Sequence, residues 1–500
     1  MATVGTESRT VGTDGGPGGD NQLRRNAIGT AGIVFFVVAA AAPLAATLGA
    51  SPLVFGSTGV GGPGAYLVAT IVLLLFAVGY ATMSRYVTSA GGFAAYISRG
   101  LGRPAGVAAA FVALLTYNCM LAGIFGQFGI FAHEILAEKL SIDLSWQLWV
   151  AIGLLAVGIL GYRDVQISAR VLGLFMVAEV LVLLVVDIFI VGDGGADGLS
   201  LVSFEPGNIF SGAVGVAFVF AFSCFVGFEA TTIYGEEARE PRRTVPRATY
   251  VAILLIGVFY TVTMWAIAMG YGAGGVEEAA QGNPVAFVFA LSDEYVGSTV
   301  TEIMNYLVIT SLFAVVLAFH NTLARYLYSL GRAGILPEPV RRTRASDGAP
   351  YVASVVQSCI TIVIVGAFAV FDADPFLELF AWLVGLGTLG VLTLQAVACV
   401  AVIAFFRRTR ADTNPWRTLI APLLGCAGLI VAIYLVLDNF DVLTGASTGI
   451  VPLLPLLIPI AAAAGVAVWY FRRGEPIDIE AGLDEPAAEA APPVEGAVAG

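Results

Sequence analysis

Residues 222–248 read FSCFVGFEATTIYGEEAREPRRTVPRA, and this stretch changes character along its length. It starts as an apolar run that could lie in a membrane. Gly227 then interrupts the run, Glu229 follows at mid-depth, and the stretch ends in arginines, from Arg239 to Arg247. Charged groups are costly inside a bilayer and are functional by default. The stretch therefore predicts a membrane span that is interrupted near its middle and ends on an arginine-rich side.

The composition extends this prediction to the whole chain. Of the 500 residues, 58% are hydrophobic and 12% are charged, whereas soluble proteins carry about 25% charged residues. Apolar runs of about 18 residues or more recur from end to end, and each is long enough to cross a bilayer core. We therefore expect an all-α polytopic membrane protein whose partner is the lipid bilayer.

Twelve transmembrane helices are expected. All the basic residues except Lys139 fall in alternate connections or tails, and by the positive-inside rule these lie in the cytoplasm, together with both termini. A wrong number of spans would scramble this alternation. The expected spans lie near 28–54, 65–84, 105–136, 147–161, 169–192, 208–234, 248–271, 299–329, 351–371, 376–406, 418–437 and 450–471.

The two ends of the chain differ from the rest. Residues 1–24 are Gly-rich and polar, and residues 474–500 are rich in Ala, Pro and Glu, so both are expected to be disordered cytoplasmic tails around a permease domain at 25–473. The five cysteines lie in apolar segments and are expected to be buried side chains, not metal ligands or disulfides. No cofactor motif or nucleic-acid-binding pattern occurs, so no cofactor, metal or nucleic acid is expected.

Span one is interrupted as well. Residues 33–55 read IVFFVVAAAAPLAATLGASPLVF, and Pro43 removes a backbone donor in mid-membrane. Two interrupted spans that lie five spans apart are typical of an inverted repeat, in which broken helices meet at the midplane and expose backbone groups to a substrate. We therefore predict a 5+5 inverted repeat of spans 1–5 and 6–10, followed by two further helices, with breaks near Ala41–Leu44 and Phe225–Phe228.

The motifs resemble those of one transporter family. The segment GFEATTIYGEEAREPRRTVPRA is similar to the span-six signature of the amino acid–polyamine–organocation superfamily. TSAGGFAAYISRGLGRPAG (88–106), ISARVLG (167–173) and ARYLYSLGRAGILPEPVRRT (324–343) resemble three further motifs of that family, in the same order. The resemblance covers roughly residues 25–475. It implies the LeuT-type fold and secondary transport of amino acids or related amines, in a plasma-membrane protein that is not an enzyme.

Two positions depart from the family pattern. Many members have a glycine-rich G-x-G at the break in span one, whose amides bind a substrate carboxylate, whereas this chain has Ala40, Ala41, Ala42 and Pro43. An amine without a carboxylate is therefore an open alternative to an amino acid. Several sodium-independent relatives have a lysine where this chain has Glu179, and a glutamate there would carry a proton or bind a cation.

These considerations give the candidate site. The expected substrate-binding residues come from the two breaks and from span three: Ala40, Ala41, Ala42, Pro43, Leu44, Asn118, Phe222, Cys224, Phe225, Val226, Gly227, Phe228 and Glu229. Phe225 is the expected lid. Glu229 either binds substrate or a proton, or caps the broken helix, and the two roles carry equal weight. Glu179 is the expected coupling residue, with the hydroxyls of Thr310 and Ser311 beside it.

The expected mechanism is alternating access with proton-coupled uptake of an apolar or small amino acid or an amine. Exchange and sodium coupling remain alternatives within the same fold. A channel usually needs a symmetric pore or a charged ring, and a membrane enzyme needs a nucleophile with a base, so both are unfavoured. The sequence does not name the substrate.

Overall fold

The computed structural model describes residues 29–87, 92–163, 169–233, 238–344 and 348–472. The two tails, expected to be disordered at 1–24 and 474–500, lie outside these ranges. Within them the chain is helical, with short turns and loops between the helices. The first half of the fold contains α1 (Thr30–Ala40), α2 (Pro43–Thr58), α3 (Gly62–Met83), α4 (Gly92–Leu101), α5 (Arg103–Leu140), α6 (Trp146–Tyr162) and α7 (Ala169–Asp193).

The rest of the chain alternates long helices with short ones. It contains α8 (Pro206–Ile209), α9 (Val214–Ser223), α10 (Ala230–Ile233), α11 (Pro241–Tyr271), α12 (Val276–Gly282), α13 (Phe287–Tyr295), α14 (Ser298–Arg332), α15 (Tyr351–Val370), α16 (Ala381–Thr409), α17 (Ala421–Asp438), α18 (Phe440–Thr444) and α19 (Leu457–Arg472). Single turns of π-helix at Pro375–Phe380 and Trp416–Ile420 lead into α16 and α17.

The protein is a multi-pass membrane protein. In the described ranges, nine helical segments are long and apolar enough to cross a bilayer. One of them, Pro43–Met83, joins α2 to α3, and the shorter apolar helices are those near Thr30–Ala39, Trp146–Tyr162 and Val214–Ser223. The 17 residues of α6 span only about 25 Å, a little less than a bilayer core. The expected number of twelve spans remains a prediction.

Span one is broken between α1 and α2. Ala42 has φ of 42°, a left-handed conformation that is rare for a residue with a side chain. Pro43 is the first residue of α2, where its missing N–H removes no helical hydrogen bond. The proline that indicated the interruption is thus the start signal of the second half-helix, and the break itself lies at Ala41 and Ala42.

Span six is broken between α9 and α10. The helix ends at Ser223, residues 224–229 form consecutive turns, and helix resumes at Ala230. Gly227 has φ of 109°, a conformation open to glycine and strained for other residues. Both predicted interruptions are therefore present, and each includes one residue with positive φ.

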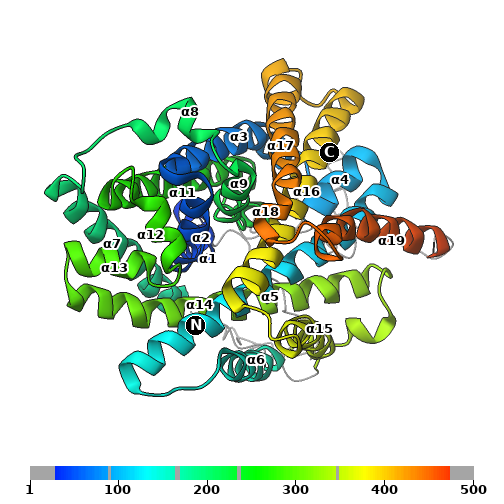
Figure 1. Ribbon diagram of the computed structural model, residues 1–500. Helices are drawn as coiled ribbons and strands as arrows, with labels where there is room; N and C mark the ends of the chain where they lie inside the picture. Colours follow the sequence, from blue (N-terminus) through cyan, green and yellow to red (C-terminus); the bar gives the residue numbers. More distant parts are fainter. Residues whose placement is uncertain (1–28, 88–91, 164–168, 234–237, 345–347, 473–500) are drawn as a thin grey trace, which may run out of the picture.

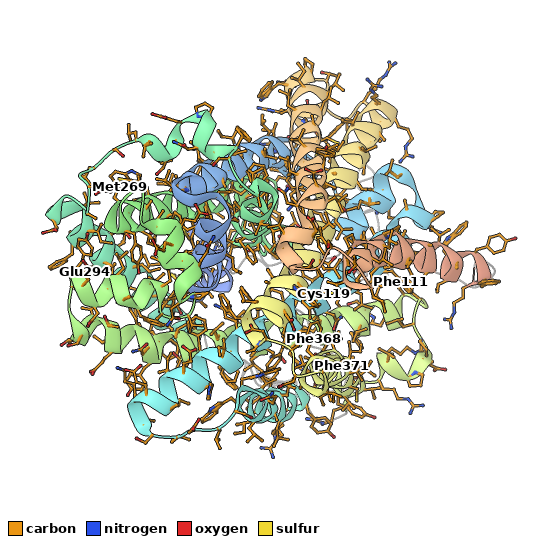
Figure 2. The ribbon with its side chains drawn as sticks, in the orientation of Figure 1. Phe111, Cys119, Met269, Glu294, Phe368 and Phe371 are labelled. Atoms are coloured by element: carbon orange, nitrogen blue, oxygen red, sulfur yellow. The ribbon has the colours of Figure 1, made fainter. Side chains whose placement is uncertain are left out.

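The two broken spans meet at the centre of the molecule. Figure 1 shows α2 and α9 in the middle of the bundle, and their residues contact each other directly. On one side α3 packs against α11, and on the other α5 packs against α14 and α16. The outer surface is apolar, as in Figure 2 around α15, where Phe371 is 84% exposed. A lipid environment explains such exposure, since a soluble protein rarely leaves large apolar areas open.

Candidate functional site

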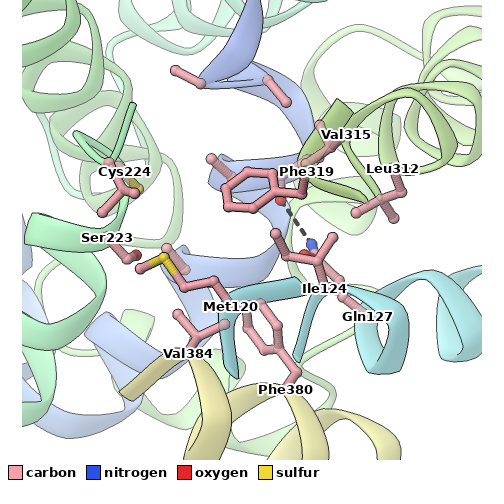
Figure 3. A pocket seen from close by; sticks show the side chains of 16 residues that line it. Met120, Ile124, Gln127, Ser223, Cys224, Leu312, Val315, Phe319, Phe380 and Val384 are labelled. Atoms are coloured by element: carbon pink, nitrogen blue, oxygen red, sulfur yellow. Dashed lines mark hydrogen bonds between the residues drawn. The ribbon is translucent and has the colours of Figure 1, made fainter. Parts of the chain in front are cut away.

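A small cavity of about 80 Å³ lies between the two breaks, as Figure 3 shows. Ala41 and Ala42 line it from the first break, and Cys224 and Val226 from the second. Other helices complete its wall with Ala45, Ala46, Ala50, Met120, Ile124, Gln127, Ser223, Leu312, Val315, Phe319, Phe380 and Val384. The cavity therefore lies where two interrupted backbones approach each other at the core of the bundle.

The cavity is small for a ligand site. Ligand pockets usually enclose about 300 Å³ or more, whereas 80 Å³ is room for two or three water molecules at about 30 Å³ each. The aromatic rings of Phe319 and Phe380 both face this space in Figure 3. A larger ligand needs these side chains or their helices to move.

The cavity wall is mostly apolar and carries no acidic or basic side chain among the described residues. Gln127 on α5 is buried and donates to the carbonyl oxygen of Ala45 at 2.7 Å, which ties α5 to α2. Gly49, one turn later on α2, permits this close approach, because a Cβ there would lie 2.6 Å from Gln127 Nε2. The wall therefore suits a ligand with an uncharged side chain, and its own side chains offer few polar groups.

Some backbone groups of the lining residues have no hydrogen-bond partner among the described residues. The carbonyl oxygens of Cys224 and Val226 accept no hydrogen bond from the described residues, because the turns of the second break bypass them. The amide of Ala45 likewise donates to none of these residues, since it lies in the first turn of α2. The residues that line the cavity therefore include two with an open carbonyl acceptor and one with an open amide donor.

The side chain of Glu179, on α7, reaches the N-terminal end of α2. Its side chain is 3% exposed, and Oε2 accepts a hydrogen bond from the Leu44 amide at 3.2 Å. A carboxylate there interacts favourably with the positive end of the helix dipole. Ser311 on α14 lies beside it, and its hydroxyl is buried. Glu179 therefore connects α7 to the break in span one.

Glu229 is held within the second break. Its Oε1 accepts from the Tyr117 hydroxyl on α5 at 2.5 Å, and its Oε2 accepts from the Gly227 amide at 2.9 Å. The carboxylate satisfies a backbone donor that the break leaves open, and it links the break to α5. This geometry corresponds to the capping role considered for Glu229, and Glu229 does not line the cavity.

The structure divides the sequence-predicted binding residues into two groups. Ala41, Ala42, Cys224 and Val226 line the cavity. The remaining described residues of the two breaks lie around it: Pro43 and Leu44 open α2, Phe222 and Phe228 are packed in the core, and Gly227 provides the turn. The side chain of Ala40 lies outside the described part of the chain.

Three predicted roles need correction. Thr310 was expected near Glu179, but it is exposed, and its hydroxyl donates to the carbonyls of Tyr306 and Leu307 on its own helix. One residue rotates a helix by about 100°, so Ser311 faces inward and Thr310 faces outward. Phe225, the expected lid, is 1% exposed and packed away from the cavity. Asn118 accepts from Gln357 on α15 at 2.8 Å and also lies away from the cavity.

Several wall residues were not found from the sequence. Gln127, Phe319 and Phe380 all line the cavity, and none lies in an interrupted span. Gln127 could have been noticed as an amide inside an apolar span, since such groups hydrogen-bond to neighbouring helices. Phe319 and Phe380 carry no comparable signal, because aromatic side chains are common in the core of helical bundles.

Comparisons with known proteins agree with this architecture. A family model described as "Amino acid permease" matches residues 28–463. The chain is 23% identical to the amino-acid permease GAP5 of Candida albicans, over 87% of this chain and 74% of the relative. It is 25% identical to the branched-chain amino acid permease BcaP of Lactococcus lactis, over 66% of this chain and 72% of the relative.

Two further similar proteins are a putrescine importer and a manganese transporter. The low-affinity putrescine importer PlaP of Escherichia coli is 24% identical, over 77% of this chain and 82% of the relative. Among solved structures, a manganese transporter of Eremococcus coleocola superposes with a TM-score of 0.56 at 14% identity, covering 91% of this chain and 95% of that one. At that identity the superposition supports the fold and no shared substrate.

Proposed function

The chain belongs to the amino acid permease family, and from this premise we propose that it is a secondary active transporter that works by alternating access. Membership makes it a transporter of amino acids or amines, not an enzyme. The finer proposal is proton-coupled uptake of an apolar or small amino acid, or of an amine, across the plasma membrane, with both termini in the cytoplasm. The observation that carries it is the small, mostly apolar cavity between the two breaks.

The lining supports a neutral side chain on the substrate. The ammonium group would bind the open carbonyls of Cys224 and Val226, and a carboxylate would bind the open amide of Ala45. No basic side chain lines the described wall, so a second acidic group would be buried without a partner. Two relatives are named for transport of branched-chain amino acids and of putrescine, so both an amino acid and an amine stay in the proposal.

Glu179 supports coupling to protons. A buried carboxylate without a basic partner needs a proton, a cation or strong hydrogen bonds to be stable in the membrane. Its described contacts are the Leu44 amide and the nearby Ser311 hydroxyl. Because Thr310 faces outward, one of the two hydroxyls expected to help bind sodium is absent, which favours the proton. Substrate exchange and sodium coupling remain the alternatives for this site.

Counterflow in proteoliposomes tests the proposed class. Vesicles loaded with an unlabelled neutral amino acid or an amine should take up the labelled form of the same compound in a saturable way. Aspartate and glutamate should give no counterflow above that of empty vesicles. An ohmic current without saturable counterflow would assign a channel instead, and counterflow of aspartate alone would contradict the neutral cavity.

A further inference from the structure

Asp187 is a second buried carboxylate on α7. It is 4% exposed, and its Oδ2 accepts a hydrogen bond from the Thr263 hydroxyl of α11 at 2.7 Å. Its other oxygen, Oδ1, is buried and has no partner among the described residues. An unpartnered oxygen of a buried carboxyl group is costly. The site therefore indicates an additional ligand, such as a proton or a water molecule.

Asp187 and Glu179 lie on the same side of α7. They are eight residues apart, which is a little over two helical turns and about 12 Å of rise. The residues between them on this side, such as Leu183 and Val186, are buried, whereas Leu181 and Ile188 are exposed toward the surroundings of the bundle. Both carboxylates thus face the protein interior, about 80° apart around the helix axis.

Polar groups on α11 lie between the two carboxylates. The Thr263 hydroxyl donates a hydrogen bond to Asp187. Tyr260, three residues earlier on the same helix, donates a hydrogen bond to the carbonyl oxygen of Ala41 at 3.3 Å. The Tyr260 hydroxyl also lies near enough to Glu179 to interact with its charge. Residues three apart on a helix face are close neighbours, and a water molecule can bridge polar groups at such a gap.

The other elements packed on α7 add few ionisable groups. Ser311 on α14 faces Glu179, and α2 contributes the Leu44 amide. On α13, Asp293 and Glu294 are exposed at the end of the helix. No basic side chain interacts with either buried carboxylate in the described ranges. Nothing in this environment therefore neutralises Asp187 permanently.

The loop after α7 covers the end of α7 that carries Asp187. Ala196 donates to the Met269 carbonyl at the end of α11, and Trp265 donates to the Ser200 carbonyl. Figure 2 shows Met269 beside this loop at the edge of the molecule. Asp187 lies six residues, or about 9 Å, before Asp193, which is exposed at the end of α7. Water at this surface is thus closer to Asp187 than to Glu179.

We propose that Asp187 is a proton-relay residue that passes protons between the water at the loop after α7 and the coupling carboxylate Glu179. A hydronium ion at the surface gives its proton to the Asp187 carboxylate and becomes water. The proton then moves along a chain of bridging water molecules beside Thr263 and Tyr260. The Asp187 O–H bond breaks, each water accepts one proton and passes one on, and an O–H bond forms at Glu179. Asp187 returns to a carboxylate. This inference rests on the proposed proton-coupled function and adds a residue to it.

The test compares Asp187→Asn with the wild-type protein and with Glu179→Gln in proteoliposomes. Asparagine can still accept from Thr263 but does not titrate. We expect the rate of pH-gradient-driven accumulation to fall at least about tenfold, because proton transfer through a positioned side chain contributes that much or more. Substrate exchange, which moves no net proton, should stay near the wild-type rate. Asp187→Glu should recover accumulation, and the matched control Asp193→Asn should leave it unchanged.

Two results for Asp187→Asn would overturn the relay. Wild-type accumulation in Asp187→Asn would remove Asp187 from the proton path, and joint loss of exchange and accumulation would assign it a structural role. Should Asp187→Asn not fold, Thr263→Val gives the decisive test, because it removes the hydrogen bond to Asp187 and keeps the carboxylate. Slowed accumulation with intact exchange in this variant would support the relay, and normal accumulation would refute it.

If the wild-type protein shows no pH-driven accumulation, the proton-coupled function fails together with the relay. If Glu179→Gln loses accumulation while Asp187→Asn retains it, the relay alone fails.

Discussion

At the scale of single residues, the decisive contact is the one between Glu179 and the Leu44 amide. It places an ionisable group at the start of α2, the half-helix that lines the cavity and that moves in the mechanism we propose. A proton on the carboxylate would weaken its charge interaction with the start of α2. Protonation of one side chain can thus bias the position of a whole half-helix.

Glu179→Gln tests this role, because glutamine keeps the shape of the side chain and can still accept a hydrogen bond from the Leu44 amide, but it cannot take up and release a proton. We expect accumulation of substrate driven by a pH gradient to disappear, since no group remains to load and release the proton. Exchange of internal for external substrate should persist. Radiolabelled uptake and exchange in the same vesicles measure both quantities, and unchanged accumulation in the variant would transfer the coupling role to Glu229.

Ala42 offers a second test at this scale. Its φ of 42° costs a residue with a side chain about 1 kcal/mol, a cost that glycine avoids. Ala42→Gly should therefore raise the thermal stability of the purified protein or leave it unchanged. Ala41→Gly is the matched control, because Ala41 has an ordinary helical φ of −70° and glycine there should lower stability. The opposite order of the two variants would show that the left-handed turn is absent.

At the scale of elements, the two breaks are held by carboxylates from different sources. Glu179 reaches α2 from α7, whereas Glu229 belongs to the second break and is fixed by Tyr117 on α5. Both half-helices are therefore attached to neighbouring helices by few hydrogen bonds. Attachments of this kind can break and re-form without unfolding the helices, which alternating access requires.

Tyr117→Phe should measure the second attachment. The change removes the hydroxyl donor and leaves a buried Glu229 oxygen without its partner, which we expect to cost about 1–3 kcal/mol in stability. Tyr326→Phe is the matched control, because its hydroxyl makes a longer bond of 3.4 Å to the Ala110 carbonyl. Thermal unfolding in detergent compares the two variants. An equal effect of both would mean that the Tyr117–Glu229 contact contributes nothing beyond a generic tyrosine hydroxyl.

The breaks were predictable from sequence because their causes are local. Pro43 and Gly227 alter the backbone by their own chemistry, whatever packs around them. The walls of the cavity were less predictable, because a side chain on an intact helix reaches the cavity only through the rotation of that helix. Thr310 and Ser311 show this limit: they are adjacent in sequence and have the same chemistry, yet one is exposed and the other buried.

At the scale of the whole molecule, the apolar exterior, the central pair of broken spans and the small cavity fit one another. The membrane class followed from composition and from the long apolar runs, because a bilayer demands long apolar helices. The inverted repeat followed from the two interrupted spans, and the LeuT-type fold from the family resemblance. Asp187 shows what such reasoning misses. Its position near the end of an apolar run gives no sign of burial, yet it is 4% exposed and accepts a hydrogen bond from Thr263 of α11.

The central claim is that a neutral amino acid or an amine is bound between the breaks and carried by the proton gradient. The most direct measurement is accumulation of a radiolabelled panel in wild-type proteoliposomes, with the lumen held more alkaline than the medium and with the gradient removed. The account predicts that a neutral apolar or small amino acid, or an amine, is concentrated only while the inward proton gradient exists, and that aspartate and glutamate are not. Accumulation that follows a sodium gradient and ignores pH, or a preference for aspartate or glutamate, would contradict it.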